Sequence, residues 1–116
     1  EKIIGFDIED WAYRNACENK NLNSCHKIDL HQSDAQGLPF AIQQFDLILA
    51  NITKNILKAD IPVYLQYLKS GGMVLLSGFF EEDIKEMLSY SEKFGLELRK
   101  KKIKNNWAAL EFIFKT

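Results

Sequence analysis

The sequence predicts an α/β fold in which an open, mostly parallel sheet ends in an antiparallel hairpin. Short apolar runs alternate with segments whose apolar residues recur at helical spacing, which is typical of strands joined by helical crossovers. The last part of the chain instead alternates apolar and polar residues on both sides of an asparagine turn, as hairpins do. The 2 prolines and 6 glycines are scattered between these segments, and no linker or repeat divides the chain. We therefore expect one continuous domain with the order β-α-β-β-α-β-α-β-β.

The first third of the chain predicts a strand, a helix and a second strand. Residues 2–8 form an apolar run that ends in an acid, which is typical of a strand buried on both faces. Asp10 is placed to cap a helix over about 11–21. A weaker strand follows at 26–31, and the polar, glycine-containing stretch 33–39 predicts a loop.

The middle of the chain predicts a buried strand followed by an interrupted helix. The strand covers residues 45–50. Residues 53–69 have a helical pattern, but Pro62 lacks an N–H group and its ring clashes with the preceding turn. We therefore expect a break near Asp60, which would cap a second helix over about 61–69.

The last part of the chain predicts a strand, a helix and a hairpin. Two glycines at 71–72 are expected to end the preceding helix, and the apolar run 73–77 predicts a strand. Three acids favour the start of a helix over about 81–93, because they complement the positive end of its dipole. The alternating segments 96–103 and 107–114 are joined by one lysine and two asparagines, which predicts a hairpin.

Composition excludes several classes of function. The 15 basic and 16 acidic residues give a formal net charge of -1, which argues against strong direct nucleic-acid binding. Cys17 and Cys25 form no metal or disulfide motif, so a reducing cytoplasm is expected. No apolar run approaches the roughly 20 residues that span a bilayer, so no membrane association is expected. His26 and His31 lack partners at metal-ligand spacing. The basic run 99–104 is interpreted as protection of an edge strand, and the alternative is a contact with ribosomal RNA.

Candidate binding residues stand where the predicted strands end, because ligands of open α/β sheets collect beyond the carboxyl ends of the strands. These residues are Asp7, Asp34 with Ala35, and Asn51. A strand-end carboxylate can accept hydrogen bonds from both hydroxyls of a ribose. An asparagine amide offers an acceptor and two donors, which suits an amine. The alternative for Asp7 and for Asn51 is that the side chain only caps a helix or a turn.

Three segments carry a resemblance to a known family. Residues 3–23 (IIGFDIEDWAYRNACENKNLN) resemble the strand and helix that follow the glycine-rich motif of class I S-adenosylmethionine methyltransferases. Residues 45–57 (FDLILANITKNIL) resemble a segment of the PrmA-type ribosomal protein L-eleven methyltransferases, and 68–83 and 107–114 follow in the same order. The resemblance covers essentially all 116 residues, and it identifies the chain as the C-terminal part of such an enzyme.

This resemblance implies a Rossmann-like methyltransferase sheet and a role for each candidate residue. Asp7 would bind the ribose of S-adenosylmethionine, Ile8 would pack on the adenine, and Asp34 and Ala35 would line the adenine pocket. Asn51 would sit beside the cofactor and position the attacking amine. The implied reaction is direct displacement on the methyl group by lysine or N-terminal amines of a large-subunit ribosomal protein, with no metal and no nucleophilic side chain.

The chain also departs from the family pattern. It contains no glycine-rich loop, and the first central strand of the family sheet and the amino-terminal substrate-recognition domain have no counterpart in it. We therefore expect residues 1–116 to be a partial methyltransferase domain that is inactive alone. The alternatives are a class I enzyme acting on RNA or a glutamine amide, a nicotinamide-binding domain that uses Asp7 in the same way, and a catalytically silent Rossmann-like module. The class I enzymes that act on RNA or a glutamine amide usually carry Asn-Pro-Pro-Tyr at the position of residues 51–54, where this chain has Asn-Ile-Thr-Lys. The terminal hairpin argues against a nicotinamide-binding domain.

Overall fold

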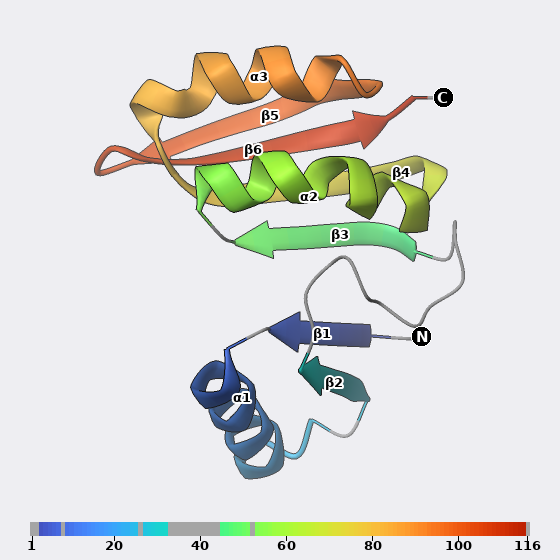
Figure 1. Cartoon of the computed structure of the whole chain (residues 1–116), viewed down its shortest axis with the longest axis vertical. Helices are drawn as coiled ribbons and strands as arrows, with labels where there is room; N and C mark the ends of the chain where they lie inside the picture. The colour runs from blue at the N-terminus through green and yellow to red at the C-terminus, as the bar shows by residue number, and fades with distance from the viewer. Residues whose placement is uncertain (1–2, 8, 26, 33–44, 52, 116) are drawn as a thin grey trace. The chain divides into compact units, whose positions relative to one another are not determined.

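The computed structural model consists of two compact units, Glu1–Pro39 and Phe40–Thr116 (Figure 1). Each unit has its own hydrogen-bonded sheet, with two strands in the first and four in the second among the described residues. The residues that the structure describes are 3–7, 9–25, 27–32, 45–51 and 53–115. The predicted site residues Ile8, Asp34 and Ala35 lie outside these described residues.

The first unit is a parallel pair of strands joined by a helix. Strand β1 (Ile3–Asp7) pairs with β2 (Ile28–Gln32), and helix α1 (Asp10–Leu22) lies between them in sequence and packs against both (Figure 1). The predicted strand, helix and strand are thus confirmed. The predicted cap is wrong, because Glu9 occupies the N-cap position and Asp10 is the first residue of the helix, where its carboxylate pairs with Arg14 at 3.0 Å.

The second unit has a mixed sheet with the strand order β3-β4-β6-β5. Strand β3 (Phe45–Asn51) is parallel to β4 (Leu68–Phe80), whereas β4 pairs antiparallel with β6 (Trp107–Phe114), and β6 pairs antiparallel with β5 (Leu96–Lys104). The predicted α/β sheet with a terminal antiparallel hairpin is confirmed. At the hairpin turn, two asparagines have left-handed backbone angles, with φ of 51° and 69°, as a two-residue type I′ turn requires.

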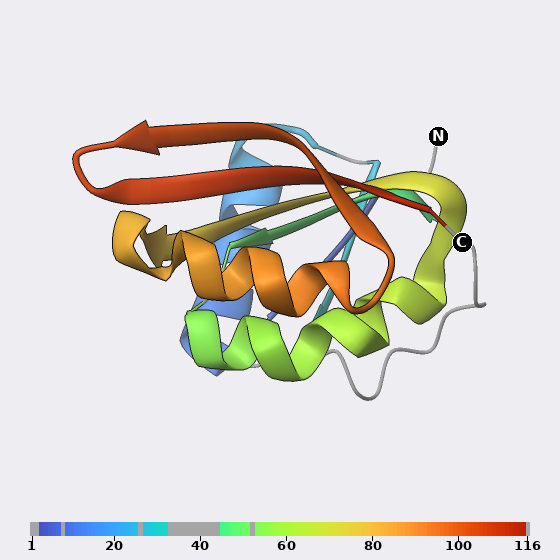
Figure 2. The ribbon, with the colours of Figure 1, turned by 90° about the horizontal axis from the view of Figure 1, so that it is seen from above.

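Helices α2 (Lys54–Tyr67) and α3 (Ile84–Glu92) cover the same face of this sheet (Figure 2). A single 3-10 turn, η2 (Glu81–Asp83), leads into α3. Alternate residues of β4 and β6 point toward the helices, and they form a core with apolar residues of α2 and α3. The largest fully buried side chains include Leu57, Ile61, Leu76, Phe79, Met87, Leu110 and Phe112. The opposite face carries the half-buried residues that alternate with these along β4 and β6, and the candidate site lies on it.

The predicted break at Pro62 is wrong, because α2 continues through this residue without interruption. Proline has no N–H group for the carbonyl four residues before it, which belongs to Lys58. The Tyr90 hydroxyl, from α3, donates a hydrogen bond to that carbonyl instead. The Lys58 ammonium lies 5.2 Å from the centre of the Tyr90 ring. A side chain from a neighbouring helix therefore satisfies the acceptor that Pro62 leaves free, and Asp60 is an ordinary helical residue.

We expect Tyr90→Phe to lower the free energy of unfolding by about 1 kcal/mol, because it leaves the Lys58 carbonyl without a donor. In a Pro62→Ala background the alanine N–H supplies the missing bond, so Tyr90→Phe should cost clearly less there. Urea unfolding of the four variants measures this coupling. An equal cost of Tyr90→Phe in both backgrounds would show that its hydroxyl does not replace the missing helix bond.

The predicted start of β4 is also wrong. Helix α2 ends at Tyr67, and the strand begins at Leu68, which is fully buried and pairs with Phe45. Gly71 has a φ of 82°, and a Cβ atom at Gly72 would lie 2.7 Å from the side chain of Leu68. The two glycines therefore belong to the first part of β4, where the backbone is irregular and Gly72 lies close to the Leu68 side chain. They do not end the helix.

Candidate functional site

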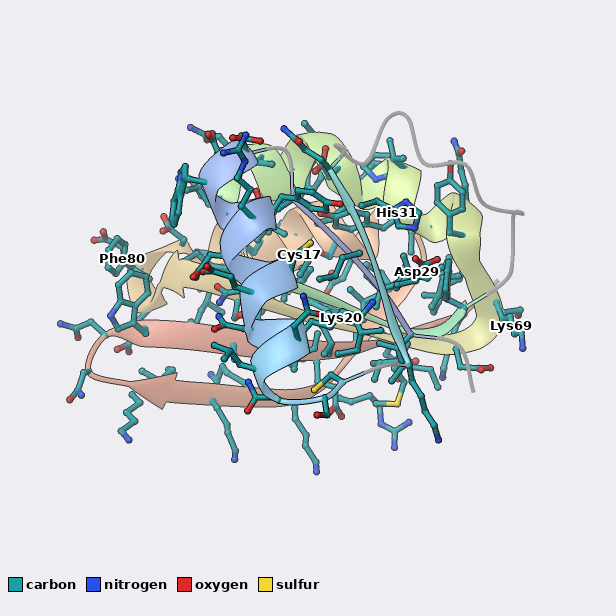
Figure 3. The ribbon with its side chains drawn as sticks, turned by 90° about the horizontal axis from the view of Figure 1, so that it is seen from below. Cys17, Lys20, Asp29, His31, Lys69 and Phe80 are labelled. Atoms are coloured by element: carbon teal, nitrogen blue, oxygen red, sulfur yellow. The ribbon has the colours of Figure 1, made fainter. Side chains whose placement is uncertain are left out.

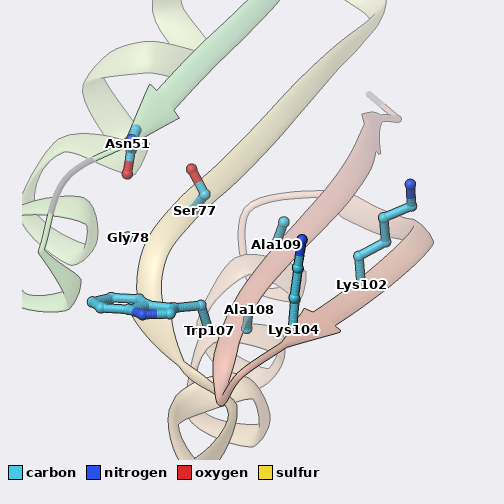
Figure 4. Close-up of a pocket in the computed structure, with 8 residues that line it drawn as sticks. All are labelled: Asn51, Ser77, Gly78, Lys102, Lys104, Trp107, Ala108 and Ala109. Atoms are coloured by element: carbon cyan, nitrogen blue, oxygen red, sulfur yellow. The ribbon is translucent and has the colours of Figure 1, made fainter.

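A pocket of about 340 Å³ lies at the end of the second unit's sheet, and all four strands contribute to it (Figure 4). The described residues that line it are Asn51, Ser77, Gly78, Lys102, Lys104, Trp107, Ala108 and Ala109. The pocket lies beyond the carboxyl ends of the parallel strands β3 and β4, where open α/β sheets bind their ligands.

The sheet register explains how residues far apart in sequence meet here. Asn51 pairs with Ser77, Ser77 with Ala109, and Ala109 with Lys102. Directly paired residues of neighbouring strands point to the same side of a sheet. These four side chains therefore form one row on the face opposite α2 and α3.

Gly78 shapes the floor of the pocket. The register shifts between Ser77 and Phe79, so Gly78 is the additional residue of a β-bulge, and its φ of 96° favours glycine. After the bulge, Phe79 returns to the core and Phe80 lies 44% exposed. Figure 3 shows Phe80 at the end of the sheet where the hairpin turns. Its ring stacks on that of Trp107, with ring centres 4.5 Å apart, so an aromatic pair borders the pocket.

Asn51 is the last residue of strand β3, and the next helix along the chain, α2, is anchored by ion pairs. Helix α2 begins at Lys54, and the Lys54 ammonium lies 3.2 Å from an oxygen of Asp83 and 3.3 Å from an oxygen of Glu86. Lys58 adds a second ion pair to Glu86 at 2.8 Å. The hydrogen bonds to Asp83 and Glu86 raise the pKa of Lys54, and those from the two lysines lower the pKa of Glu86. These contacts tie the start of α2 to η2 and α3.

Of the predicted site residues that the structure describes, the pocket contains Asn51. Asp7 is the exposed last residue of β1 in the first unit, and its Oδ1 accepts a hydrogen bond from the Glu9 N–H at 3.0 Å. No other hydrogen bond to the Asp7 carboxylate occurs among the described residues, so its second oxygen is open to a ligand. The proposed roles of both residues remain predictions.

The hairpin contributes to the pocket, which the sequence did not predict. The basic run predicts protection of an edge, and β5 is the edge strand of the four-stranded sheet. Lys102 and Lys104 also line the pocket, together with Trp107. The available signal was the spacing of two between the lysines, which places both on one face of a strand. That this face is also the one that carries Asn51 depends on the pairing of β5, β6, β4 and β3, which the sequence does not show.

The structure describes His31 but not His26, and the His31 Nε2 lies 3.3 Å from an oxygen of Asp29 (Figure 3). Within the described ranges, no group of three or more His, Cys, Asp or Glu residues is placed to hold a metal ion. In the same part of the chain, no helix is long and apolar enough to span a membrane.

Comparison with known proteins identifies the family. The family model described as "Ribosomal protein L11 methyltransferase (PrmA)" matches residues 1–115. The chain belongs to this family. Among curated PrmA relatives, the ribosomal protein L11 methyltransferase of Porphyromonas gingivalis is 44% identical over 110 residues, which are 95% of this chain and 38% of that protein. The corresponding protein of Phocaeicola vulgatus is 39% identical over 113 residues, 97% of this chain and 40% of that protein. The chain thus spans about two fifths of the length of these relatives.

Solved structures confirm the predicted methyltransferase fold. The ribosomal protein L11 methylase of Lactobacillus delbrueckii subsp. bulgaricus superposes with a TM-score of 0.91 and 26% identity, over 100% of this chain and 59% of that one. A SAM-dependent methyltransferase from Aquifex aeolicus superposes with a TM-score of 0.83 over 97% of this chain and 69% of that one. At 11% identity this second likeness concerns the fold alone. The PrmA family and the class I type of sheet agree with the resemblance found in the sequence.

Proposed function

We propose that this chain supplies the substrate side and the ribose and adenine contacts of an S-adenosylmethionine-dependent methyltransferase that modifies amino groups of ribosomal protein L11. The observation that carries the proposal is the pocket at Asn51, at a parallel strand end in a chain of the PrmA family. Residues 1–116 are on this proposal a partial methyltransferase domain, and the glycine-rich loop that holds the methionine part of the cofactor comes from outside them. The substrate is a large-subunit ribosomal protein, and the reaction takes place in the cytoplasm, where ribosomal proteins are made.

The chemistry of the described residues suits this reaction. S-adenosylmethionine supplies a methyl group on a positively charged sulfur, which is a good leaving group. The Asn51 side-chain oxygen accepts a hydrogen bond from the substrate amine, which directs the nitrogen lone pair toward the methyl carbon. The free oxygen of Asp7 binds a ribose hydroxyl of the cofactor. Ile8, Asp34 and Ala35 complete the adenine side. Catalysis on this proposal rests on alignment, and no side chain forms a covalent intermediate.

A chimera tests the proposed function. Residues 1–116 replace the matching segment of the Porphyromonas gingivalis relative, which is 44% identical to this chain. The purified chimera is incubated with methyl-labelled S-adenosylmethionine and ribosomal protein L11, and the labelled positions are mapped by mass spectrometry. We expect label on L11 amino groups at a rate within about tenfold of the unaltered relative. A chimera that folds and binds the cofactor but labels ribosomal RNA or a glutamine amide, and not L11, would contradict the proposal.

A further inference from the structure

Two lysines give the pocket an excess of positive charge. Lys102 and Lys104 project from β5 on the face that carries Asn51 (Figure 4). Both side chains are exposed, and neither has an ion-pair partner within the part of the chain that the structure describes. The lysines that do pair with carboxylates in the structure are Lys54, Lys58, Lys69 and Lys115.

Among the described residues that line the pocket, no acidic group compensates the two charges. Strand β3 contributes an amide, β4 a hydroxyl and a glycine, and β6 an indole and two alanines. Further along the same face, Lys100 of β5 pairs in register with Glu111 of β6. Glu81 lies near the hairpin turn, where its N–H group donates a hydrogen bond to the Asn106 carbonyl at 2.7 Å. Its side chain is exposed, and Glu81 is not one of the described residues that line the pocket. The described lining residues thus carry two positive charges and no negative one.

The proposed reaction requires an amine without a proton. An ammonium group has no lone pair, and a lysine amine with a pKa near 10.4 is neutral in only about one molecule in a few thousand at pH 7. An enzyme can remove the proton with a general base, or it can disfavour the ammonium form with nearby like charges. The described lining residues include no carboxylate and no histidine. Lys102 and Lys104 are placed to act by the second route, because their charges have no partner among the described residues.

We propose that the ammonium groups of Lys102 and Lys104 select the neutral, nucleophilic form of the substrate amine at this pocket. This inference rests on the proposed function. The amine loses its proton to water before it reacts. Its nitrogen then forms a bond to the methyl carbon while the carbon–sulfur bond breaks, and the electron pair of that bond goes to sulfur. The methylated ammonium gives its proton to water, and the two lysines favour this step as well. Lys102 and Lys104 therefore act on the amine through their charge alone, and they exchange no proton themselves.

A thiol placed at position 51 of this chain measures the electrostatic effect of Lys102 and Lys104 at the pocket. Asn51→Cys is introduced with Cys17→Ser and Cys25→Ser, and the pKa of the new thiol is read from the pH dependence of its alkylation by iodoacetamide. Positive charges stabilise a thiolate, so Lys102→Met with Lys104→Met should raise this pKa by about half a unit to one unit at low salt. High salt should shrink the difference, because it screens exposed charges.

Two further variants serve as controls for the probe. Lys102→Arg with Lys104→Arg keeps the charge and should keep the low thiol pKa. Lys85→Met removes an exposed lysine of α3, outside the pocket, and should leave the thiol pKa unchanged. An equal thiol pKa in the lysine and methionine forms would overturn the inference whether or not the chimera methylates L11. The probe therefore separates this inference from the proposed function.

The active chimera tests the consequence for catalysis. The single-turnover rate at saturating substrate is measured against pH, because this profile reports ionisations in the bound state. The methionine pair should move the midpoint of the profile up by about half a unit to one unit, which is a loss of about 3- to 10-fold in rate at neutral pH. The rates should converge at alkaline pH. An unchanged midpoint with a raised KM would instead show that the lysines hold an anionic group of the substrate, such as a carboxylate or an RNA phosphate, and would overturn the inference.

Discussion

Asn51→Ala should lower the rate of methyl transfer by the chimera about 100-fold, in the range found when one positioned hydrogen-bonding group is removed from an active site. The side chain lies at the end of β3 in the pocket. Alanine keeps the backbone but removes the oxygen that accepts the amine hydrogen. Binding of the cofactor should change by less than about threefold, because the proposed ribose contact belongs to Asp7.

A matched control uses the same substitution on the neighbouring helix. Asn55 is an exposed residue of α2 and does not line the pocket, so Asn55→Ala should leave the rate unchanged. Single-turnover rates and calorimetric titration with S-adenosylhomocysteine separate the two effects. If Asn51→Ala turned over as fast as the unaltered chimera, Asn51 would be only a strand-end residue before a helix, and its proposed role would be wrong.

The second large effect concerns Asp7. Asp7→Ala should weaken cofactor binding by the chimera about 10- to 100-fold, because charge-assisted hydrogen bonds contribute about 1.5–3 kcal/mol each. The same carboxylate accepts the Glu9 N–H within the first unit, so alanine also removes a local contact. Asp7→Asn separates the two roles. Its amide oxygen still accepts the Glu9 N–H, whereas the charge that strengthens the ribose bond is lost.

Calorimetry with S-adenosylhomocysteine and thermal unfolding together decide between these roles. If Asp7 binds ribose, Asp7→Asn should weaken binding with little loss of stability. A loss of stability without a loss of affinity would assign Asp7 to the turn before α1 alone. Asp10→Ala is the control, because Asp10 is also exposed near the start of α1 and its carboxylate pairs with Arg14. It should leave cofactor affinity unchanged.

Local sequence patterns were sufficient for the order of the elements. The hairpin around two asparagines, the strand–helix–strand unit of the first sheet and the position of Asn51 at a strand end all depend on residues close together in sequence. Patterns of this kind are read from the period of the apolar residues and from turn chemistry. The errors arose where a distant segment changed the local preference. Pro62 stays within a helix because the Tyr90 hydroxyl, 32 residues beyond Lys58, takes the place of an N–H group.

The sequence by itself therefore determined the fold class, the PrmA family and the place of Asn51, because family segments and strand ends are local features. Only the tertiary structure decided the composition of the pocket wall. Lys102 and Trp107 lie more than 50 residues after Asn51, and they reach it through β4 and β6. A basic run on an edge strand has the same local pattern whether its charges face solvent or a reacting amine. The pairing of strands across the sheet decides which, because it fixes the face and the row in which each side chain lies.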